Sequence, residues 1–373
     1  MRAIPVDCIR DGSSLAKTIY DMDGRILLKQ GVKISDIIKK KLNSLNVNSV
    51  SIIDEISEKE IKSIIQPELR KKAIKLIRET FANAMRLQKV RKLESLDTIS
   101  KDDISEDDSY IKSIGNLANE LIENLLDNNE LMYSLIDIRN LDPYTYEHSL
   151  NVAVTSLVMG IGLKMNIKDL IDLAMAALLH DIGKAFISKD IIIKKGPLSF
   201  SEYKQMQQHP KRGYDYLKDN KFISAESRVA ILQHHERFDG NGYPNRLQGN
   251  QISLIARIIC IADVYDALLS NRSYKQPMSP NEAMEYIMAN SGTAFDHELV
   301  KLFARIFVPY PNGTKVFLSN DEAGLVLNTL PNFPLRPNVL ITESNDDTRI
   351  GKKVSLINEL SLVIQNCEKA SSM

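Results

Sequence analysis

Residues 169–184 read DLIDLAMAALLHDIGK, an apolar segment that ends in an adjacent histidine and aspartate. The segment is apolar on nearly every side, which predicts a buried helix. We expect Gly183 to stop that helix in the left-handed conformation, which glycine adopts at no steric cost. His180, Asp181 and Lys184 should then lie together at one helix end. Because buried histidines are often hydrogen-bonded to carboxylates, the pair alone leaves a structural role and a metal site open.

The other histidines favour the metal site. Five of the six histidines lie between residues 148 and 235, each near an expected helix end or turn. Five separate structural roles would be needed to explain them, whereas a metal centre explains them together. Imidazoles with carboxylates suit divalent Fe, Mn, Zn, Co or Ni, and so many donors exceed what one ion takes. The sequence therefore predicts two ions bridged by a carboxylate. The five are His148, His180, His209, His234 and His235, and His297 stands apart.

Asp263 is the candidate for a second carboxylate ligand. It interrupts an apolar helical segment at residues 258–268. Burying an unpaired carboxylate costs several kcal/mol, so Asp263 needs a partner. A metal ion would satisfy it, and a buried Arg or Lys is the alternative. Asp266, one turn further on, is expected on the same helix face.

These residues suit hydrolysis of a phosphate ester. Two ions roughly 3.5–4 Å apart would activate a bridging water as nucleophile and clamp the phosphate oxygens. Lys184 would stabilise the charge that develops during the reaction. Arg272 and Lys275 follow the Asp263 segment and would bind a phosphate-bearing substrate, although solvated surface cations are the alternative.

Composition limits the classes of partner. Acidic and basic residues balance at 48 and 48 in 373 residues, so no overall field favours a nucleic acid polymer or an anionic membrane. Cys8, Cys260 and Cys367 lie far apart and fit a reducing compartment without disulfides. No apolar run reaches the ~18 residues that membrane insertion needs. We therefore expect a cytoplasmic protein of two or more domains.

The chain is expected to be mainly α, with a helical core between smaller flanking parts. Residues 1–56 are predicted as a β-rich regulatory module with a short helix at 35–45. Residues 57–112 are predicted as a charged helical linker, in which 101–109 form an acidic connection. The basic run Arg70-Lys71-Lys72 is expected on a solvated helix face, with binding of an acidic partner as the alternative.

The helical core is predicted over residues 113–310, with early helices at 114–126 and 131–139. Ser199 and Glu202 form a capping box, and its helix should end at His209, before Pro210. A small β appendage is predicted at 311–345. Residues 346–373 are taken as a C-terminal tail.

Several of these motifs together resemble the HD-GYP domain, a bacterial branch of the HD phosphohydrolases. They are His180-Asp181 with Lys184, the run His234-His235-Glu236, and the loop Asp239-Gly240-Asn241-Gly242-Tyr243-Pro244. With His209 before a proline and the Asp263 segment, they occur in the family's order over roughly residues 115–310. The resemblance implies an all-helical HD-type core that hydrolyses cyclic di-GMP to linear pGpG, GMP or both.

The resemblance also implies roles for individual residues. Asp181 would bridge the two ions, and Lys184 would lie at the scissile phosphate. Tyr243, Arg272 and Lys275 would contact the dinucleotide, and Asp266, grouped with them on the substrate side, would support the site. The implied metal ligands are His148, His180, Asp181, His209, His234, His235 and Asp263.

One departure from the family bears on the product. Some members bind a third metal through a glutamate one helical turn before the first histidine, and Tyr144 occupies that position here. Glu147 is adjacent to His148 and is expected on another face. A two-metal site follows, with Fe or Mn as the expected ions, Zn, Co or Ni as in vitro substitutes, and pGpG as the expected product.

Two other functions stay open at this stage. The intact Gly242-Tyr243-Pro244 loop argues against a generic nucleotide hydrolase but admits another cyclic dinucleotide, such as cyclic GMP-AMP. A non-hydrolytic cyclic di-GMP sensor would be favoured by loss of a ligand or of Lys184, and none is lost. The N-terminal part resembles the small module that often precedes HD-GYP domains, which suggests regulation or a homodimer. Apolar residues at 114–138 fit a core or a dimer face, and their helical spacing favours core.

Overall fold

The computed structural model describes most of the 373-residue chain. The described residues are 2–5, 13–16, 18–20, 26–44, 49–53, 65–93, 101–127, 133–134, 146–194, 196–270, 278–310, 312–330 and 332–366. The internal contacts divide the chain into two compact units. One unit comprises residues 64–130 and 143–303, and the other comprises residues 1–63, 131–142 and 304–373.

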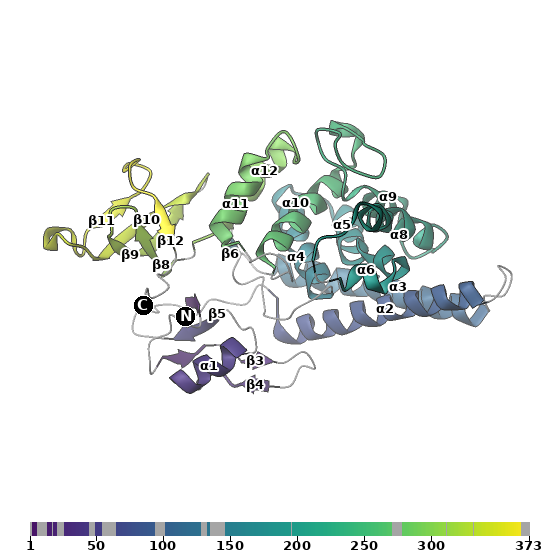
Figure 1. The fold of residues 1–373 in the computed structure, drawn as a ribbon, viewed down its shortest axis with the longest axis horizontal. Helices are drawn as coiled ribbons and strands as arrows, with labels where there is room; N and C mark the ends of the chain where they lie inside the picture. Colours follow the sequence, from purple (N-terminus) through teal and green to yellow (C-terminus); the bar gives the residue numbers. More distant parts are fainter. Residues whose placement is uncertain are drawn as a thin grey trace. The chain divides into compact units, whose positions relative to one another are not determined.

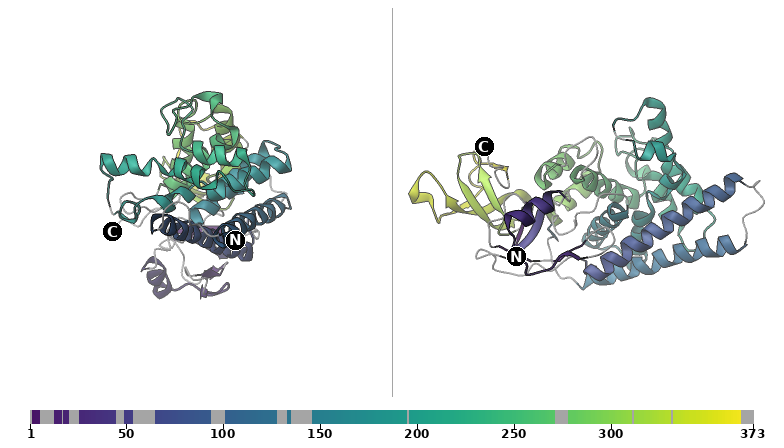
Figure 2. Two further views of the ribbon diagram at one scale, coloured as in Figure 1. Left: turned by 90° about the vertical axis from the view of Figure 1, so that its right-hand side faces the viewer. Right: turned by 60° about the horizontal axis from the view of Figure 1, so that its bottom comes forward.

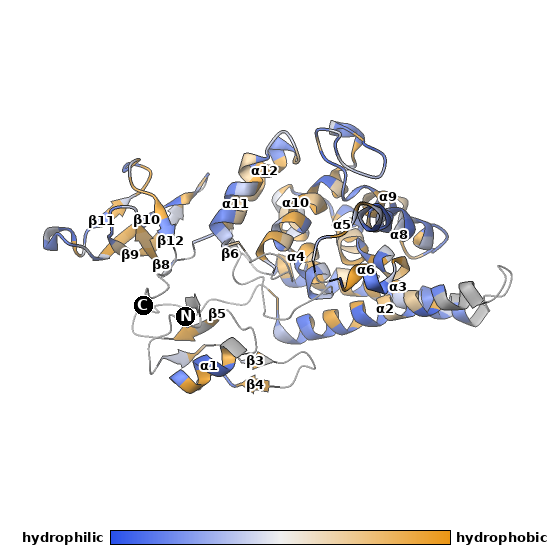
Figure 3. Ribbon diagram, in the orientation of Figure 1, coloured by the Kyte–Doolittle hydropathy of each residue, from blue (hydrophilic) through white to orange (hydrophobic). Residues whose placement is uncertain are grey.

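The first unit is helical, and its core is formed where α4, α5 and α10 pack together (Figure 1). Colouring by hydropathy shows these three helices to be largely apolar (Figure 3). The helices are α2 (Pro67–Leu93), α3 (Lys101–Leu126), α4 (Tyr146–Gly162), α5 (Ile167–Leu179), α6 (Lys189–Ile192), α7 (Phe200–Met206), α8 (His209–Leu217), α9 (Ala225–Gln233), α10 (Leu254–Leu269), α11 (Pro280–Ala289) and α12 (His297–Ile306), which runs on into the second unit.

Helices α2 and α3 lie side by side (Figure 2). Ile114, Leu121 and their apolar neighbours on α3 are buried, which confirms the prediction of core for this part of the helix. The acidic residues 101–109 belong to α3, and the expected connection is therefore wrong. Two of these acidic residues pair with α2: Arg86 donates hydrogen bonds to Asp103 at 2.7 Å and to Glu106 at 2.8 Å.

Side-chain caps fix the starts of several helices. The predicted capping box of Ser199 and Glu202 opens α7, and Ser253 caps α10 by accepting from the backbone amide of Ala256. The prediction that one helix runs to His209 is wrong, because α7 ends at Met206 and His209 begins α8. Pro210 lies in the first turn of α8, where its missing amide hydrogen costs nothing.

The second unit contains two small β-structures, each with its own core. At the N-terminus, β5 is antiparallel to both β1 and β2, and Leu15, Leu42 and Ile52 are buried with their apolar neighbours. This agrees with the predicted β-rich module and its short helix. The elements are β1 (Arg2–Pro5), β2 (Ser14–Leu15), β3 (Ile19–Tyr20), β4 (Ile26–Leu28), α1 (Asp36–Ser44) and β5 (Ser49–Ile53).

The C-terminal structure is an antiparallel sheet with strand order β11-β10-β9-β8-β12. It packs around Tyr310, Val339 and Leu356. Two of its strands lie beyond residue 345, so the sheet is larger than the predicted appendage and uses part of the predicted tail. Its strands are β8 (Lys315–Leu318), β9 (Ala323–Leu330), β10 (Phe333–Glu343), β11 (Lys353–Ser355) and β12 (Ile364–Asn366).

One predicted helix is corrected in this unit. Tyr133–Ser134, within the helix expected at 131–139, form strand β6, which pairs in parallel with β7 (Phe307–Val308). The other residues of that range lie outside the described part of the chain. Among the described residues, we find no helix with the length and apolar character that crossing a membrane requires. The fold class is confirmed as mainly α, with small flanking sheets.

Candidate metal centre

The His180-Asp181 pair lies where α5 ends and a 3₁₀ turn, Ile182–Phe186, begins. The prediction of a left-handed Gly183 is wrong, because Gly183 lies within this turn and is not among the residues of positive φ. Glycine is required there for close packing instead. A Cβ on Gly183 would lie 1.9 Å from the carbonyl oxygen of His209. The missing side chain thus allows the pair to approach the start of α8.

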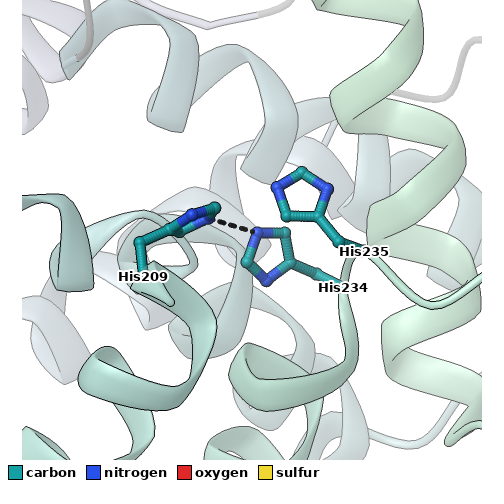
Figure 4. Close-up of side chains that lie close together, drawn as sticks. All are labelled: His209, His234 and His235. Carbon is teal, nitrogen blue, oxygen red and sulfur yellow. Dashed lines mark hydrogen bonds between the residues drawn. The ribbon is translucent and has the colours of Figure 1, made fainter. Parts of the chain in front are cut away.

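Four further helices bring the remaining predicted ligands to this point. His148 comes from α4, His209 begins α8, His234 and His235 follow α9, and Asp263 lies on α10. Figure 4 shows three of these imidazoles converging. The seven predicted ligands form three overlapping groups, within each of which the donor atoms lie within 4.8 Å of one another. The groups are His209, His234 and His235; His148, His180 and Asp263; and His180, Asp181 and His234.

The carboxylates lie between the imidazoles. His148 Nε2 is 3.1 Å from Asp263 Oδ1, and His209 Nε2 is 3.3 Å from Asp181 Oδ1. His235 Nδ1 is 3.7 Å from Asp263 Oδ2. The ion-pair partners of Asp263 in the described part of the chain are these histidines, rather than the Arg or Lys of the alternative interpretation.

Backbone carbonyls fix the orientation of three imidazoles. The Nδ1 atoms of His180, His209 and His234 each lie 2.7–2.8 Å from the carbonyl oxygen three residues earlier. A carbonyl can only accept, so each Nδ1 carries the hydrogen and each Nε2 is left with a lone pair in the neutral ring. The lone pairs point into the cluster, which is how a metal-ligating histidine is commonly held.

Two observations show that the cluster fits a cation. His180 Nε2 is buried and has no hydrogen-bond partner among the described residues, a state that costs about 1–3 kcal/mol. The Nε2 atoms of His209 and His234 lie 3.2 Å apart although both rings use Nδ1 as the donor. At metal–nitrogen distances of ~2.0–2.1 Å, two ligands of one ion are roughly 3 Å apart. A divalent cation would therefore satisfy the unpaired Nε2 of His180 and separate the facing lone pairs of His209 and His234.

The charge states also suit a cation. Burial lowers the pKa of His234 well below its usual range and that of His235 to about 3, so both rings are neutral at pH 7. The carboxylates stay ionised, because Lys184 and the nearby histidines outweigh burial and lower the pKa of Asp181, as His148 does for Asp263. Neutral imidazoles and ionised carboxylates are the forms that bind metal.

His148 is pulled toward protonation by two carboxylates. Burial alone lowers its pKa, but the hydrogen bonds with Asp263 and Asp266 outweigh burial and raise it to about 10. The two ring nitrogens have different partners, since Nδ1 lies 2.7 Å from Asp266 Oδ2 while Nε2 faces Asp263. A divalent cation at Nε2 can take the place of the proton and balance the same carboxylate charge.

The Gly-Tyr-Pro loop lies directly against the double histidine. A Cβ on Gly242 would lie 2.6 Å from the carbonyl oxygen of His235, so only glycine fits at that position. The rings of Tyr243 and His235 have centroids 4.8 Å apart. Tyr243, predicted to contact substrate, is therefore beside the metal-ligand cluster. Lys184 is also in place, with Nζ 2.5 Å from Asp181 Oδ2.

Comparisons with known proteins agree with this geometry. The family profile described as an HD domain matches residues 122–299. Over these residues the chain is similar to HD domains. A cyclic di-GMP phosphodiesterase of Pseudomonas aeruginosa is 35% identical over 227 residues, or 60% of this chain. A cyclic di-GMP phosphodiesterase response regulator of Xanthomonas campestris is 44% identical over 133 residues, or 35% of this chain. These matches confirm the predicted resemblance to HD-GYP phosphodiesterases.

Other relatives act on a different dinucleotide. A 3'3'-cGAMP-specific phosphodiesterase of Vibrio cholerae is 43% identical over 129 residues, or 34% of this chain. The chain spans 54%, 35% and 24% of the lengths of these three relatives. A solved HDG"Y"P protein from Bdellovibrio bacteriovorus is 15% identical with a TM-score of 0.45, and the match covers 81% of this chain and 97% of that one.

The candidate ligands have a supporting network that the sequence did not reveal. Asp266 accepts a hydrogen bond from Asn151 at 3.1 Å as well as contacting His148. Asn151 and Glu147 in turn accept from Arg70, which is 2.8 Å from the Glu147 carboxylate. The prediction of a solvated Arg70 is wrong, since this residue is only 8% exposed. The network explains why Glu147 faces away from the metal ligands.

The Gly-Tyr-Pro loop has its own support. Glu236, next to the double histidine, is buried, and its carboxylate accepts from the backbone amides of Asn245 at 2.6 Å and Leu247 at 3.1 Å. Sequence reasoning placed Glu236 in the motif but gave it no role. Its position directly after two ligands and before a glycine-rich loop was the available signal.

Three predicted positions cannot be placed, because Arg272, Lys275 and Tyr144 lie outside the described residues. Their proposed roles in phosphate binding and in limiting the number of ions remain predictions. His297 is exposed to solvent with its Nδ1 2.8 Å from Ser291 Oγ. It belongs to none of the three groups of donor atoms, as expected.

Proposed function

We propose that this protein is a metal-dependent phosphodiesterase that hydrolyses cyclic di-GMP to linear pGpG. The observation that carries the proposal is the cluster of five imidazoles and two carboxylates, in which the donor atoms converge. It lies in the part of the chain that resembles proteins named as cyclic di-GMP phosphodiesterases. The function concerns the HD domain, and the flanking modules have no assigned role in the reaction.

The proposed ligands are His148, His180, Asp181, His209, His234, His235 and Asp263, with Asp181 shared between two ions. The unpaired Nε2 of His180 supports this assignment. We propose Fe or Mn as the native ions; the imidazole and carboxylate donors accommodate both, and would also take Zn, Co or Ni in vitro. When bound, divalent ions stabilise charge on phosphate oxygens and supply a water-derived nucleophile at neutral pH.

The protein's own groups hold the substrate and balance its charge. Lys184 contacts Asp181 and is about a third exposed at its side chain, so its ammonium group can reach both the cluster and a bound phosphate. It would stabilise negative charge that increases in the transition state. Arg272 and Lys275 are proposed to bind the phosphate groups of the dinucleotide, and Tyr243 to pack against it beside His235.

A second substrate is supported by one specific comparison. The Vibrio cholerae relative that is 43% identical over 129 residues is specific for 3'3'-cGAMP. The two dinucleotides share the sugar-phosphate ring and differ in one base. The metal-ligand cluster cannot distinguish between them, because it acts at the phosphate.

The proposal is tested by anaerobic turnover of purified full-length protein reconstituted with Fe(II) or Mn(II). Cyclic di-GMP and 3'3'-cGAMP are supplied separately, and products are separated by chromatography. We expect hydrolysis of cyclic di-GMP, with pGpG accumulating and little GMP. Faster hydrolysis of 3'3'-cGAMP would show that 3'3'-cGAMP, rather than cyclic di-GMP, is the preferred substrate. Tight binding of cyclic di-GMP without turnover under either metal would contradict the enzyme and favour a sensor.

A further inference from the structure

A cavity of about 440 Å³ opens beside the metal-ligand cluster. Its walls come from the turn between α7 and α8, through Gln207 and Gln208, and from the Gly-Tyr-Pro loop, through Asn241, Tyr243 and Arg246. Gln208 directly precedes the predicted ligand His209, and Tyr243 contacts the ring of His235. The cavity is therefore adjacent to the place where a phosphate would be cleaved.

The lining has the chemistry of a hydrogen-bonding surface. Three amide side chains and one guanidinium face a space whose volume falls in the range of roughly 300–1,000 Å³ typical of ligand pockets. Amides can donate and accept in one plane, and a guanidinium can donate two parallel hydrogen bonds. These are the groups that read the edges of purine bases, with Arg suited to O6 and N7 of guanine.

The position of Arg246 is imposed by the protein. Its φ of 56° lies in the left-handed region, which non-glycine residues rarely occupy and which often marks a functional constraint. The amides on both sides of it, Asn245 and Leu247, are held by the buried carboxylate of Glu236. Because Glu236 directly follows His235, the same segment positions a predicted metal ligand and Arg246.

One aromatic side chain of α7 lies close to the cavity. Tyr203 is 49% exposed, which is high for a large ring. Tyr203 and Gln207 are four residues apart and therefore on the same helix face. Burial raises the pKa of Tyr243, and the nearby Tyr203 phenol adds to this rise. An exposed ring beside a polar cavity suits stacking against a nucleobase.

We propose that this cavity binds one guanine base of the cyclic dinucleotide, with Arg246 donating to its O6 and N7 atoms. The inference rests on the proposed function and extends it by naming a residue that selects the base. Adenine presents an amino donor where guanine has O6, so Arg246 would disfavour adenine. The amides of Gln207 and Gln208 complete the hydrogen-bonding edge.

The test compares kcat/KM for cyclic di-GMP and cyclic di-AMP in the full-length, Mn(II)-loaded protein. Bis(p-nitrophenyl) phosphate, a diester without bases, serves as a third substrate. For Arg246→Gln we expect kcat/KM for cyclic di-GMP to fall about ten- to hundredfold, as for loss of one bidentate base contact. Turnover of bis(p-nitrophenyl) phosphate, metal content and kcat/KM for cyclic di-AMP should stay within about twofold of the unmodified protein, our threshold for an unchanged value.

Two further variants separate base reading from charge. Arg246→Lys keeps the positive charge but loses the paired donors, so it should show the same loss of selectivity. Lys211→Gln, which removes an exposed cation of α8 outside the cavity lining, should leave selectivity unchanged. Equal losses on all three substrates, or unchanged selectivity in Arg246→Gln, would overturn the subsite. Absence of turnover of every cyclic dinucleotide by the unmodified protein would instead overturn the proposed function.

Discussion

The Nε2 atoms of His209 and His234 lie 3.2 Å apart, although both rings donate their Nδ1 hydrogens to backbone carbonyls. In the neutral state the two lone pairs face each other. A proton or a metal ion between them removes the repulsion. Burial lowers the pKa of His234 well below its usual range, which disfavours the proton and leaves a metal ion as the better occupant.

Removal of metal should therefore destabilise the helical unit. A ligand that binds only the folded state at a hundred times its Kd stabilises by about 2.7 kcal/mol. We expect anaerobic chelation to lower the melting temperature and Mn(II) or Fe(II) to restore it, measured by differential scanning calorimetry. In His234→Ala the melting temperature should no longer respond to metal, whereas His297→Ala, outside the cluster, should respond like the unmodified protein. An equal metal response in His234→Ala would contradict the assignment.

Lys184 should act on the reaction rather than on metal binding. It contacts Asp181, and an ammonium group has no lone pair to offer a metal ion. Lys184→Ala should retain its metal while kcat falls about 10²–10³-fold, the range for loss of one charge-stabilising group. Metal content is measured by mass spectrometry, and kcat is measured by steady-state turnover. Lys301→Ala, on the exposed side of α12, is the control. Loss of metal together with activity would show a structural role.

Asp266 should act through His148. Its carboxylate is 2.7 Å from His148 Nδ1, whereas the sequence grouped it with the substrate contacts. Partners of this kind typically affect metal affinity by about 10–100-fold. Asp266→Asn should therefore weaken metal binding by that factor, and excess Mn(II) should recover most of the turnover. A raised KM for the dinucleotide with unchanged metal affinity would show that Asp266 contacts the substrate, as the sequence predicted.

The buried ion pair of Arg70 and Glu147 should matter for stability. Removing one member leaves a charge without its partner and costs about 3–5 kcal/mol, while replacing both with apolar residues can be neutral. We expect Arg70→Met to lower the free energy of unfolding in urea by that amount. The double variant Arg70→Met with Glu147→Leu should regain most of it. A double variant as unstable as the single one would mean that the pair itself provides net stability.

The sequence predicted the cluster of candidate metal ligands because its signal is local or compositional. His180 and Asp181 end an apolar helix, His234 and His235 are adjacent, and Asp263 interrupts an apolar run. The structure brings all of them together. Helix starts were also predictable, since a cap such as Ser199 with Glu202 involves residues three positions apart.

The support around the ligands could not be predicted in the same way. Arg70 and Glu147 are separated by 77 residues, and an arginine within a basic run gives no sign of a distant buried partner. Gly183 shows a second limit. Its requirement comes from the carbonyl of His209 on another helix, whereas sequence reasoning offered only the local turn as an explanation.

The most direct measurement is a metal titration of the metal-free full-length protein under anaerobic conditions. Bound Fe(II) or Mn(II) and cyclic di-GMP hydrolysis are followed in the same samples. We expect turnover to rise with metal content, to level off at two ions per chain, and to yield pGpG with little GMP. Full turnover in chelated protein that contains no metal, or saturation with metal without any hydrolysis of a cyclic dinucleotide, would contradict the proposed function.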